Sequence, residues 1–141
     1  MVKILFDRDL CLGCKSCELA CAAAHSRSKS LIGAIKEKKL SRIRIKMKSG
    51  RIKVEQCMLC KNPKCIETCP TGALYKDKDG TVKVNYFTCT GCGLCKQACP
   101  FGAIALQTFP TLCDRCAEAD EPLCARSCPT KALKVRAVNI V

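Results

Sequence analysis

Sixteen cysteines dominate this chain of 141 residues, and their spacing constrains the fold more than any other feature. In the first and third of four groups, three cysteines follow one another at intervals of two residues, and a fourth comes after three more residues. The second and fourth groups keep nearly the same rhythm. Any fold must therefore be built around what these sulfurs bind. The groups are Cys11, Cys14, Cys17 and Cys21; Cys57, Cys60, Cys65 and Cys69; Cys89, Cys92, Cys95 and Cys99; and Cys113, Cys116, Cys124 and Cys128.

The third group reads C-x2-C-x2-C-x3-C and is followed by Pro100, which is the spacing of bacterial iron–sulfur sites. At four thiolates per cluster, the cysteines predict four [4Fe–4S] clusters. Zinc ribbons use two C-x2-C pairs and have no need of three cysteines at successive intervals of two. A disulfide-rich secreted protein would begin with an export signal, whereas the first apolar run here is short and soon ended by charges. The spacing therefore favours iron and sulfur over zinc or disulfides.

No apolar stretch of the sequence approaches the roughly 18 residues of a membrane span. We therefore expect no membrane span and a location in the reducing cytoplasm, where close C-x2-C pairs are metal sites. Tryptophan is absent and aromatic residues make up only 4% of the chain, so the organic core should be thin for this length. We expect the clusters to fill the interior, so that removing the metal unfolds the chain.

Three of the four cysteine groups end in versions of one phrase, namely CPTGAL at 69–74, CPFGAI at 99–104 and CPTKAL at 128–133. About one helical turn fits between the third and fourth cysteine of each group, and the proline that follows prevents the helix from continuing. In the first group Ala22 takes the place of the proline, so the helix there can continue to residue 24.

Two hairpins are predicted between the cysteine groups. Residues 73–75 and 81–84 flank a turn at 78–80. Residues 42–48 alternate basic and apolar side chains, Ser49 and Gly50 turn the chain, and 51–54 returns. Residues 26–30 are polar and are predicted to form a loop, whereas residues 31–40 fit either a short helix or a loop. The second hairpin should turn one set of apolar side chains inward: Ile43, Ile45, Met47, Ile52 and Val54.

Hairpins and short helices placed between cluster-binding loops predict a single α+β domain over residues 1–141 with a ferredoxin-like architecture.

The cysteine groups with their neighbours resemble the four-cluster iron–sulfur subunits of the dimethyl sulfoxide reductase type. Three stretches carry the resemblance, CLGCKSCELAC at 11–21, CMLCKNPKCIETCPTGAL at 57–74 and CTGCGLCKQACPFGAI at 89–104, together with the interval of seven residues inside the fourth group. The chain is most similar to the small soluble versions that serve carbon monoxide dehydrogenase, aldehyde oxidoreductase, hydrogenase or formate dehydrogenase. The resemblance covers essentially the whole chain, and its motifs are specific for cluster content rather than for the partner enzyme.

In two-cluster ferredoxins the fourth cysteine of one motif binds the cluster of the other motif. The resemblance implies two nested bacterial dicluster ferredoxin modules, an outer one of 1–30 plus 107–141 and an inner one of 55–106, with a basic β-ribbon at 41–54. The two ends of such a chain meet. Spacing alone leaves open a sequential pairing of the first group with the second and of the third with the fourth. The ligand sets implied by the resemblance are Cys11, Cys14, Cys17 and Cys128 for cluster 1; Cys113, Cys116, Cys124 and Cys21 for cluster 2; Cys57, Cys60, Cys65 and Cys99 for cluster 3; and Cys89, Cys92, Cys95 and Cys69 for cluster 4.

The resemblance implies a non-catalytic electron-transfer subunit. Its clusters would form a wire between a catalytic subunit that contains tungsten, molybdenum or nickel–iron and a second electron carrier. The sequence itself lacks G-x-G-x-x-G and Walker motifs, and its single histidine, His25, is not enough for a hydrolytic triad. We therefore expect no catalytic residues. Because sixteen cysteines already match four clusters, His25 is expected in a polar surface role rather than as a ligand.

The formal net charge is +13, and four all-cysteine clusters would lower it by about eight. Residues 27–53 hold eleven basic residues and one acid, Glu37, which predicts a partner-binding face. The acidic segment 114–121 holds the opposite charge, so the two segments also predict head-to-tail association of copies into a homo-oligomer.

Two other functions fit parts of the sequence. A nucleic-acid-binding protein with structural clusters would use the basic ribbon on phosphates. We expect no nucleic-acid partner, because one structural cluster would serve that purpose and there are almost no aromatic side chains to stack on bases. A maturation or storage protein for iron–sulfur clusters would hold labile clusters that transfer to acceptors.

Overall fold

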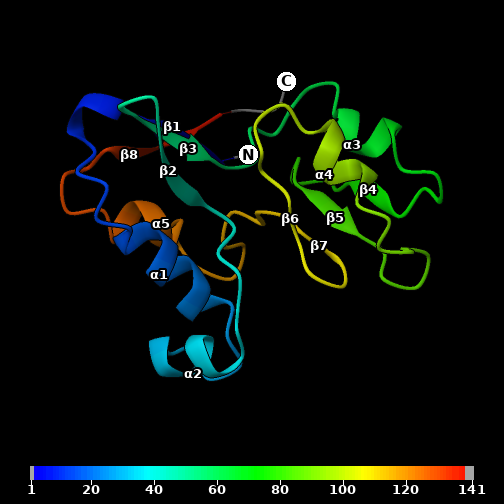
Figure 1. Ribbon diagram of the computed structural model, residues 1–141, viewed down its shortest axis with the longest axis horizontal. Helices are drawn as coiled ribbons and strands as arrows, with labels where there is room; N and C mark the ends of the chain where they lie inside the picture. Colours follow the sequence, from blue (N-terminus) through cyan, green and yellow to red (C-terminus); the bar gives the residue numbers. More distant parts are fainter. Residues whose placement is uncertain (1, 139–141) are drawn as a thin grey trace.

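Short helices and strands connected by long loops make up the structure, a computed structural model that describes residues 2–138 (Figure 1). The predicted α+β class with short helices and hairpins is confirmed. The elements, in chain order, are β1 (Val2–Phe6), the 3-10 helix η1 (Arg8–Leu10), α1 (Ser16–Ala24), α2 (Leu31–Lys36), β2 (Arg44–Lys48), β3 (Arg51–Glu55), α3 (Lys64–Glu67), β4 (Leu74–Lys76), β5 (Val82–Val84), α4 (Leu94–Ala98), β6 (Ala105–Leu106), β7 (Pro110–Thr111), α5 (Leu123–Arg126) and β8 (Leu133–Ala137).

Four helices lie where the cysteine motifs predict a helical turn. Helices α1, α3, α4 and α5 each begin at the residue before the third cysteine of a motif, and the last three end before the fourth. Pro70, Pro100 and Pro129 follow the fourth cysteine in those three motifs and stop the helix. Helix α1 continues through Cys21 to Ala24 because alanines stand there instead. Both predictions are confirmed.

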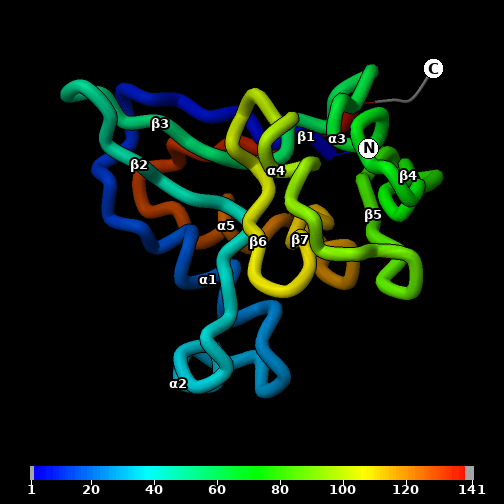
Figure 2. The backbone as a smooth tube through the Cα atoms, turned by 45° about the vertical axis from the view of Figure 1, so that its right-hand side comes forward, coloured from blue at the N-terminus to red at the C-terminus, as the bar shows by residue number. Residues whose placement is uncertain are grey.

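The ambiguous segment 31–40 forms helix α2 in its first half. The Ser30 side chain caps this helix, because its Oγ accepts a hydrogen bond from the Gly33 N–H at 3.1 Å. The preceding residues 26–30 form a loop, as predicted. Helix α2 packs against α1 and lies to one side of the molecule, as Figure 2 shows.

Both predicted hairpins are present. Strands β4 and β5 pair in antiparallel fashion around the turn before Thr81, and β2 and β3 pair around Ser49 and Gly50. These two turn residues have φ angles of 52° and 70°, the left-handed conformations of a tight hairpin turn. Gly50 adopts this conformation without steric cost.

The β2–β3 ribbon buries most of its predicted inward face, with one exception. Ile43 and Ile45 are buried, and Ile52 and Val54 are half-buried. Met47 is 68% exposed, so its predicted inward position is wrong. Met47 pairs with Ile52 close to the turn, where the two strands extend beyond the apolar core.

The two ends of the chain meet in a sheet that the strand patterns did not predict. Strand β1 pairs with β8 in antiparallel register, with Ile4 opposite Val135 and Phe6 opposite Leu133. Two further strands, β6 and β7, form a minimal hairpin in the middle of the molecule. Each of the four sheets among residues 2–138 has only two strands, so the loops between them depend on other contacts for their position.

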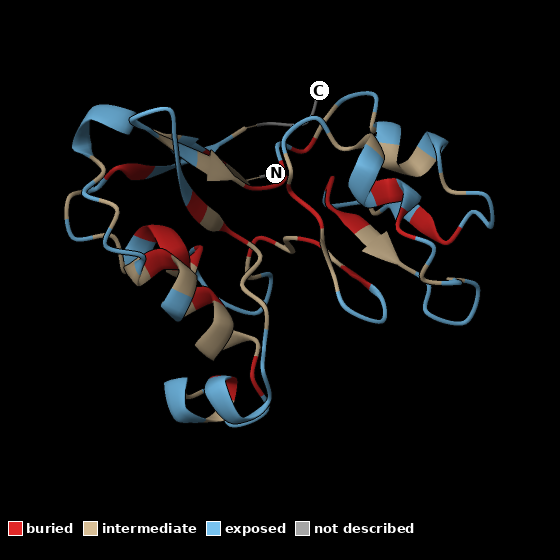
Figure 3. Cartoon of the chain, in the orientation of Figure 1, coloured by how far each residue is buried: buried red, intermediate tan, exposed pale blue. Residues whose placement is uncertain are grey.

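Small apolar clusters lie at the two ends of the molecule, with a smaller one between them (Figure 3). Few large aliphatic side chains are buried, and cysteines are members of every cluster, which agrees with the expected thin core. The first cluster contains Ile4, Ile43, Ile45, Leu133, Cys17, Cys21, Cys124 and Ala125; the second contains Leu74, Val82, Cys95, Ile104 and Leu112; the third contains Cys57, Leu59 and Ala103.

Candidate iron–sulfur sites

Two small, apolar cavities are each lined by four cysteines. Neither lining contains a histidine or a carboxylate, so the only metal ligands that converge there are sulfurs. All sixteen cysteines of the chain are unbridged. Four thiolates are the ligand set of a [4Fe–4S] cluster, so the donors present fit this group. Site 1 is lined by Cys11, Cys14, Cys17 and Cys128, and site 4 by Cys69, Cys89, Cys92 and Cys95.

Site 2 lies where helices α1 and α5 approach the fourth motif. Burial and the negative charges of the other three sulfurs together raise the pKa of Cys124 to about 12. Thiolates that repel one another in this way are stabilised by a cation among them, and the iron of a cluster would supply that charge. The sulfurs whose charges act on Cys124 are those of Cys21, Cys113 and Cys116, and we refer to these four cysteines as site 2.

Site 3 lies between the second and third motifs. Burial, followed by the charges of Cys57 and Cys99, raises the pKa of Cys65 to about 11. Burial also raises the pKa of Cys57, and the charges of Cys113 and Cys60 act on it in the same direction. We refer to Cys57, Cys60, Cys65 and Cys99 as site 3. In sites 1 and 4, where four cysteines line one cavity, three come from one motif and the fourth comes from another.

The repeated phrase after the fourth cysteine surrounds its sulfur with donors at sites 1 and 4. Burial alone would raise the pKa of Cys69, but the Thr71 hydroxyl and the backbone N–H groups of Leu74, Thr71 and Ala73 outweigh it and lower the pKa to about 7. Cys128 has the same kind of surroundings, with Thr130 in the equivalent position, and its pKa is also lowered against the effect of burial. The phrase therefore builds a pocket that stabilises a thiolate.

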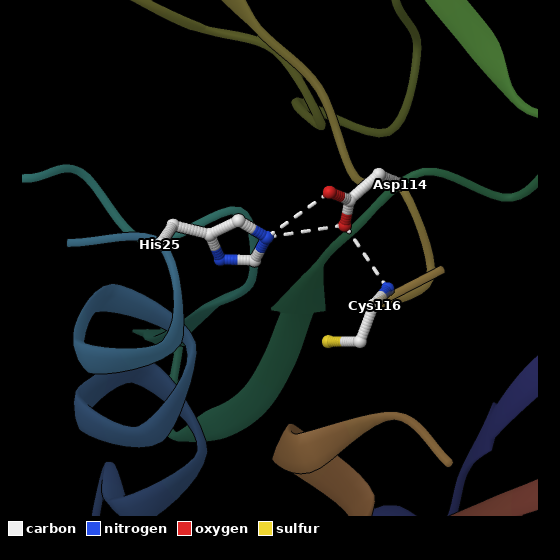
Figure 4. A group of neighbouring side chains, drawn as sticks. All are labelled: His25, Asp114 and Cys116. Atoms are coloured by element: carbon white, nitrogen blue, oxygen red, sulfur yellow. Dashed lines mark hydrogen bonds and ion pairs between the residues drawn. The ribbon is translucent and has the colours of Figure 1, made fainter. Parts of the chain in front are cut away.

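His25 lies at the edge of site 2, where it makes polar contacts as predicted but is largely buried rather than on the surface. Its side chain is 12% exposed and connects helix α1 to the fourth motif (Figure 4). Nδ1 lies 2.7 Å from the carbonyl oxygen of Cys21, and Nε2 lies 3.1 Å from Asp114 Oδ1. The hydrogen bond with Asp114 and then that with Cys21 raise the pKa of His25 to about 9, so the ring carries a positive charge beside the Cys21 sulfur.

Asp114 connects several groups around site 2. It accepts hydrogen bonds from His25 and from the backbone N–H of Cys116, and it pairs with Arg42 at 2.6 Å. Burial would raise the pKa of Asp114, but these partners hold it well below its usual range. Sequence reasoning missed this network because His25 and Asp114 are 89 residues apart.

The basic and acidic segments meet within one chain. In addition to the Arg42–Asp114 pair, Lys29 lies 3.8 Å from Glu118. Within the ribbon, Glu55 pairs with Arg44 and Lys46 at 3.1 and 3.0 Å. Across residues 2–138, no helix has the length and apolar character that crossing a bilayer requires.

Comparison with known proteins identifies the cysteine arrangement. Residues 48–138 match a family described as 4Fe-4S dicluster domain, and residues 3–70 match a second family with the same description. Two dicluster domains, each binding two clusters, together with sixteen cysteines fit four [4Fe–4S] clusters.

Three curated relatives are aligned over most of the chain. An iron-sulfur protein of Rhodospirillum rubrum is 36% identical over 155 residues, covering 95% of this chain and 81% of its own. The electron transport protein HydN of Escherichia coli (strain K12) is 31% identical, covering 92% and 85%. The thiosulfate reductase electron transfer subunit PhsB of Salmonella typhi is 30% identical, covering 93% and 73%.

A solved structure shares the fold. It belongs to the active site complex BamBC of benzoyl coenzyme A reductase with 1,5-dienoyl-CoA, and it is 24% identical to this protein with a TM-score of 0.53. The alignment covers 100% of this chain and 79% of that one.

Proposed function

Because the chain belongs to the 4Fe-4S dicluster domain family, we propose that it is an electron-transfer subunit whose four clusters form a wire between a catalytic oxidoreductase subunit and a second electron carrier. The observation that carries this proposal is that two small cavities are each lined by four cysteines and no other metal ligand, while the other eight cysteines have nearly the same spacing in the sequence. When bound, [4Fe–4S] clusters supply one-electron redox chemistry. The residues of the chain hold the clusters, limit access of water and provide the surfaces on which partners dock.

We assign one cluster to each of sites 1–4, with the ligands named above, and a nested, ferredoxin-like arrangement of two modules. The outer module is 1–30 plus 107–141, of which 139–141 lie outside the described residues, and the inner module is 55–106. The pairing of β1 with β8 supports this assignment, because it closes the outer module. The separate apolar clusters at the two ends of the molecule also support it.

The order of the sites along the wire follows from the helices that carry them. Cys17 of site 1 and Cys21 of site 2 lie about one turn apart on α1. Site 3 takes Cys65 from α3, and site 4 takes Cys95 from α4, at the opposite end of the long axis from α1 (Figure 1). Sites 2 and 3 adjoin, because Cys113 packs against the small cluster that contains Cys57. The order is therefore 1–2–3–4.

The two ends of this row are suited to exchange electrons with partners. Cys14 in site 1 and Cys92 in site 4 are exposed, whereas none of the ligands assigned to sites 2 and 3 is exposed. Electrons can enter or leave only where a partner approaches a cluster closely. We therefore propose that one partner docks over each end.

The names of the relatives support a reductase-type partner, since one of them is the electron transfer subunit of a thiosulfate reductase. We propose that the catalytic subunit, of the tungsten, molybdenum or nickel–iron type, presents an acidic surface. The basic residues of 27–53 that form no ion pair with the described residues 2–138 would face it. Asp114 and Glu118 already pair within the chain, which favours docking to such a partner over head-to-tail association through 114–121. Those basic residues are Arg27, Lys36, Lys38, Lys39, Lys48, Arg51 and Lys53.

Nucleic-acid binding and cluster storage are not favoured. Four basic residues of the segment 27–53 are neutralised by acids of the same chain, which lowers the charge available to phosphates. The ligands of sites 2 and 3 are less accessible than those of sites 1 and 4. Release of clusters would require these central ligands to become accessible, whereas passage of electrons would not, so the arrangement suits electron transfer better than storage.

Anaerobic purification from the native source tests the proposal. We expect a complex with a redox enzyme, about four clusters per chain and reversible reduction of each. A chain without a redox partner, whose clusters are redox-silent and whose binding to a random duplex falls with salt, would contradict it.

A further inference from the structure

Arg115 lies at the junction between sites 2 and 3. Its side chain is buried, with the residue only 8% exposed. Nη1 donates a hydrogen bond to the Cys113 sulfur at 3.3 Å, and Nη2 donates one to the backbone carbonyl of Cys57. One guanidinium thus contacts a ligand residue of each central site, and it connects the second motif to the fourth.

This buried positive charge has no carboxylate partner among the described residues. None of the ion pairs found across residues 2–138 includes Arg115, and its Nε makes no hydrogen bond there. A buried arginine is costly unless negative charge lies nearby. A group that can carry negative charge, the Cys113 sulfur, lies 3.3 Å from Nη1.

The backbone at Arg115 shows that the four loops are not equivalent. In every motif the residue before the second cysteine has a left-handed backbone, a conformation that costs free energy for any residue except glycine. At sites 1 and 4 this residue is glycine, whereas at the central sites it carries a buried side chain. The central loops therefore retain a strained residue whose side chain fills the junction. The four residues are Gly13, Leu59, Gly91 and Arg115, with φ angles of 70°, 51°, 71° and 59°.

We propose that Arg115 raises the reduction potentials of the clusters at sites 2 and 3. This inference rests on the proposed function. Reduction adds a negative charge to a cluster that is already anionic, and burial disfavours the more highly charged form. A fixed positive charge in the low-dielectric junction offsets that effect at the two most buried sites. Arg115 would thereby keep the reduction potentials of the central clusters from falling so low that they hinder electron transfer between sites 1 and 4.

The test compares variants of the whole chain, prepared anaerobically with their clusters, in redox titrations followed by electron paramagnetic resonance. In Arg115→Gln we expect two of the four potentials to shift to lower values and the other two to stay unchanged. Arg115→Lys keeps the charge, so its central potentials should stay close to those of the native chain. Arg136→Gln removes the same charge from an exposed position on β8 and should shift none of them.

Several results would overturn the proposal. One is an Arg115→Gln chain with full iron content and four unchanged potentials. Another is an equal shift of all four potentials, or the same shift in Arg136→Gln, since either would reflect net charge alone. If Arg115→Gln loses iron, the comparison is made with Arg115→Lys instead. Loss of iron from Arg115→Lys as well would show that the sites require the geometry of the arginine side chain rather than its charge, which would overturn the proposal. Four redox-active clusters in the native chain would leave the proposed function standing in each case, whereas their absence would defeat that function itself.

Discussion

Each of the four sites has four cysteine sulfurs, but the terminal sites 1 and 4 differ from the central sites 2 and 3 in the groups that surround these sulfurs. Each terminal site has an exposed cysteine, a glycine in its left-handed loop position, and a fourth cysteine beside a threonine hydroxyl. Each central site has no exposed cysteine, and Leu59 or Arg115 fills its loop position. Under the proposed function, these differences would suit the end sites to electron exchange with partners and the central sites to electron passage through the interior.

Removal of iron should have the largest effect and should separate the two kinds of site. We expect an anaerobic chelator to release iron in two phases, about half of it quickly from the exposed terminal sites and the rest slowly. The helical signal in circular dichroism should fall in both phases, because the apolar clusters contain cysteines of terminal sites (Cys17 and Cys95) as well as of a central site (Cys21 and Cys124). A single release phase, or a chain that keeps its helices without iron, would remove the basis of the comparison.

Substitution of one ligand should cost more at a central site than at a terminal one. Cys92→Ser should leave about twelve iron atoms per chain, because an exposed ligand of an end site is lost. Cys57→Ser should leave fewer, since Cys57 is buried and packs with Cys113 of the neighbouring site. Iron analysis of the two variants measures the difference, and equal iron contents would count against it.

Alanine substitution of the loop glycines in the two terminal sites, Gly13 in site 1 and Gly91 in site 4, should lower the free energy of unfolding by different amounts. A Cβ at Gly91 would lie 2.5 Å from the Thr108 carbonyl oxygen, whereas at Gly13 the nearest atom is 3.8 Å away, in Ile52. Gly13→Ala should lower the free energy of unfolding by about 1–2 kcal/mol, the cost of a left-handed alanine. Gly91→Ala should cost more, because backbone must also move. Anaerobic thermal melts of both variants test this, and a Gly13 variant that is the less stable of the two would contradict it.

The smallest effect concerns the threonines of the terminal sites. Thr71→Val and Thr130→Val each remove a hydroxyl that lies 3.6 or 3.8 Å from the fourth cysteine sulfur. Hydrogen bonds to sulfur favour the reduced cluster, so one terminal potential should fall slightly in each variant. Thr111→Val is the control, because among the described residues the Thr111 hydroxyl makes no hydrogen bond to a cysteine sulfur. A shift of the central potentials would show that the sites are not independent.

Local features could be predicted from spacing and turn residues, whereas the long-range contacts that were predicted came only from the family resemblance. The helical turns between cysteines and both hairpins follow from spacing, proline and turn residues within short segments. The β1–β8 pairing joins residues more than a hundred positions apart, and the apolar/basic alternation of Leu133–Ala137 does not say which strand is its partner. Met47 fits the ribbon pattern, yet the pattern does not say where the core ends.

Single charged residues around the sites were the hardest to predict. Arg115 reads as an ordinary surface arginine in sequence, because only the fold buries it between two motifs. His25 likewise gains its role from Asp114, a residue that packing alone brings near. Ligand residues repeat with a recognisable spacing, whereas the residues that tune them occur once.

The most direct test of a four-cluster wire is a combined iron analysis and reductive titration of the anaerobically prepared chain. We expect about sixteen iron atoms per chain and uptake of about four electrons, one for each cluster. A colourless protein, or one with far less iron that takes up no electrons, would contradict it.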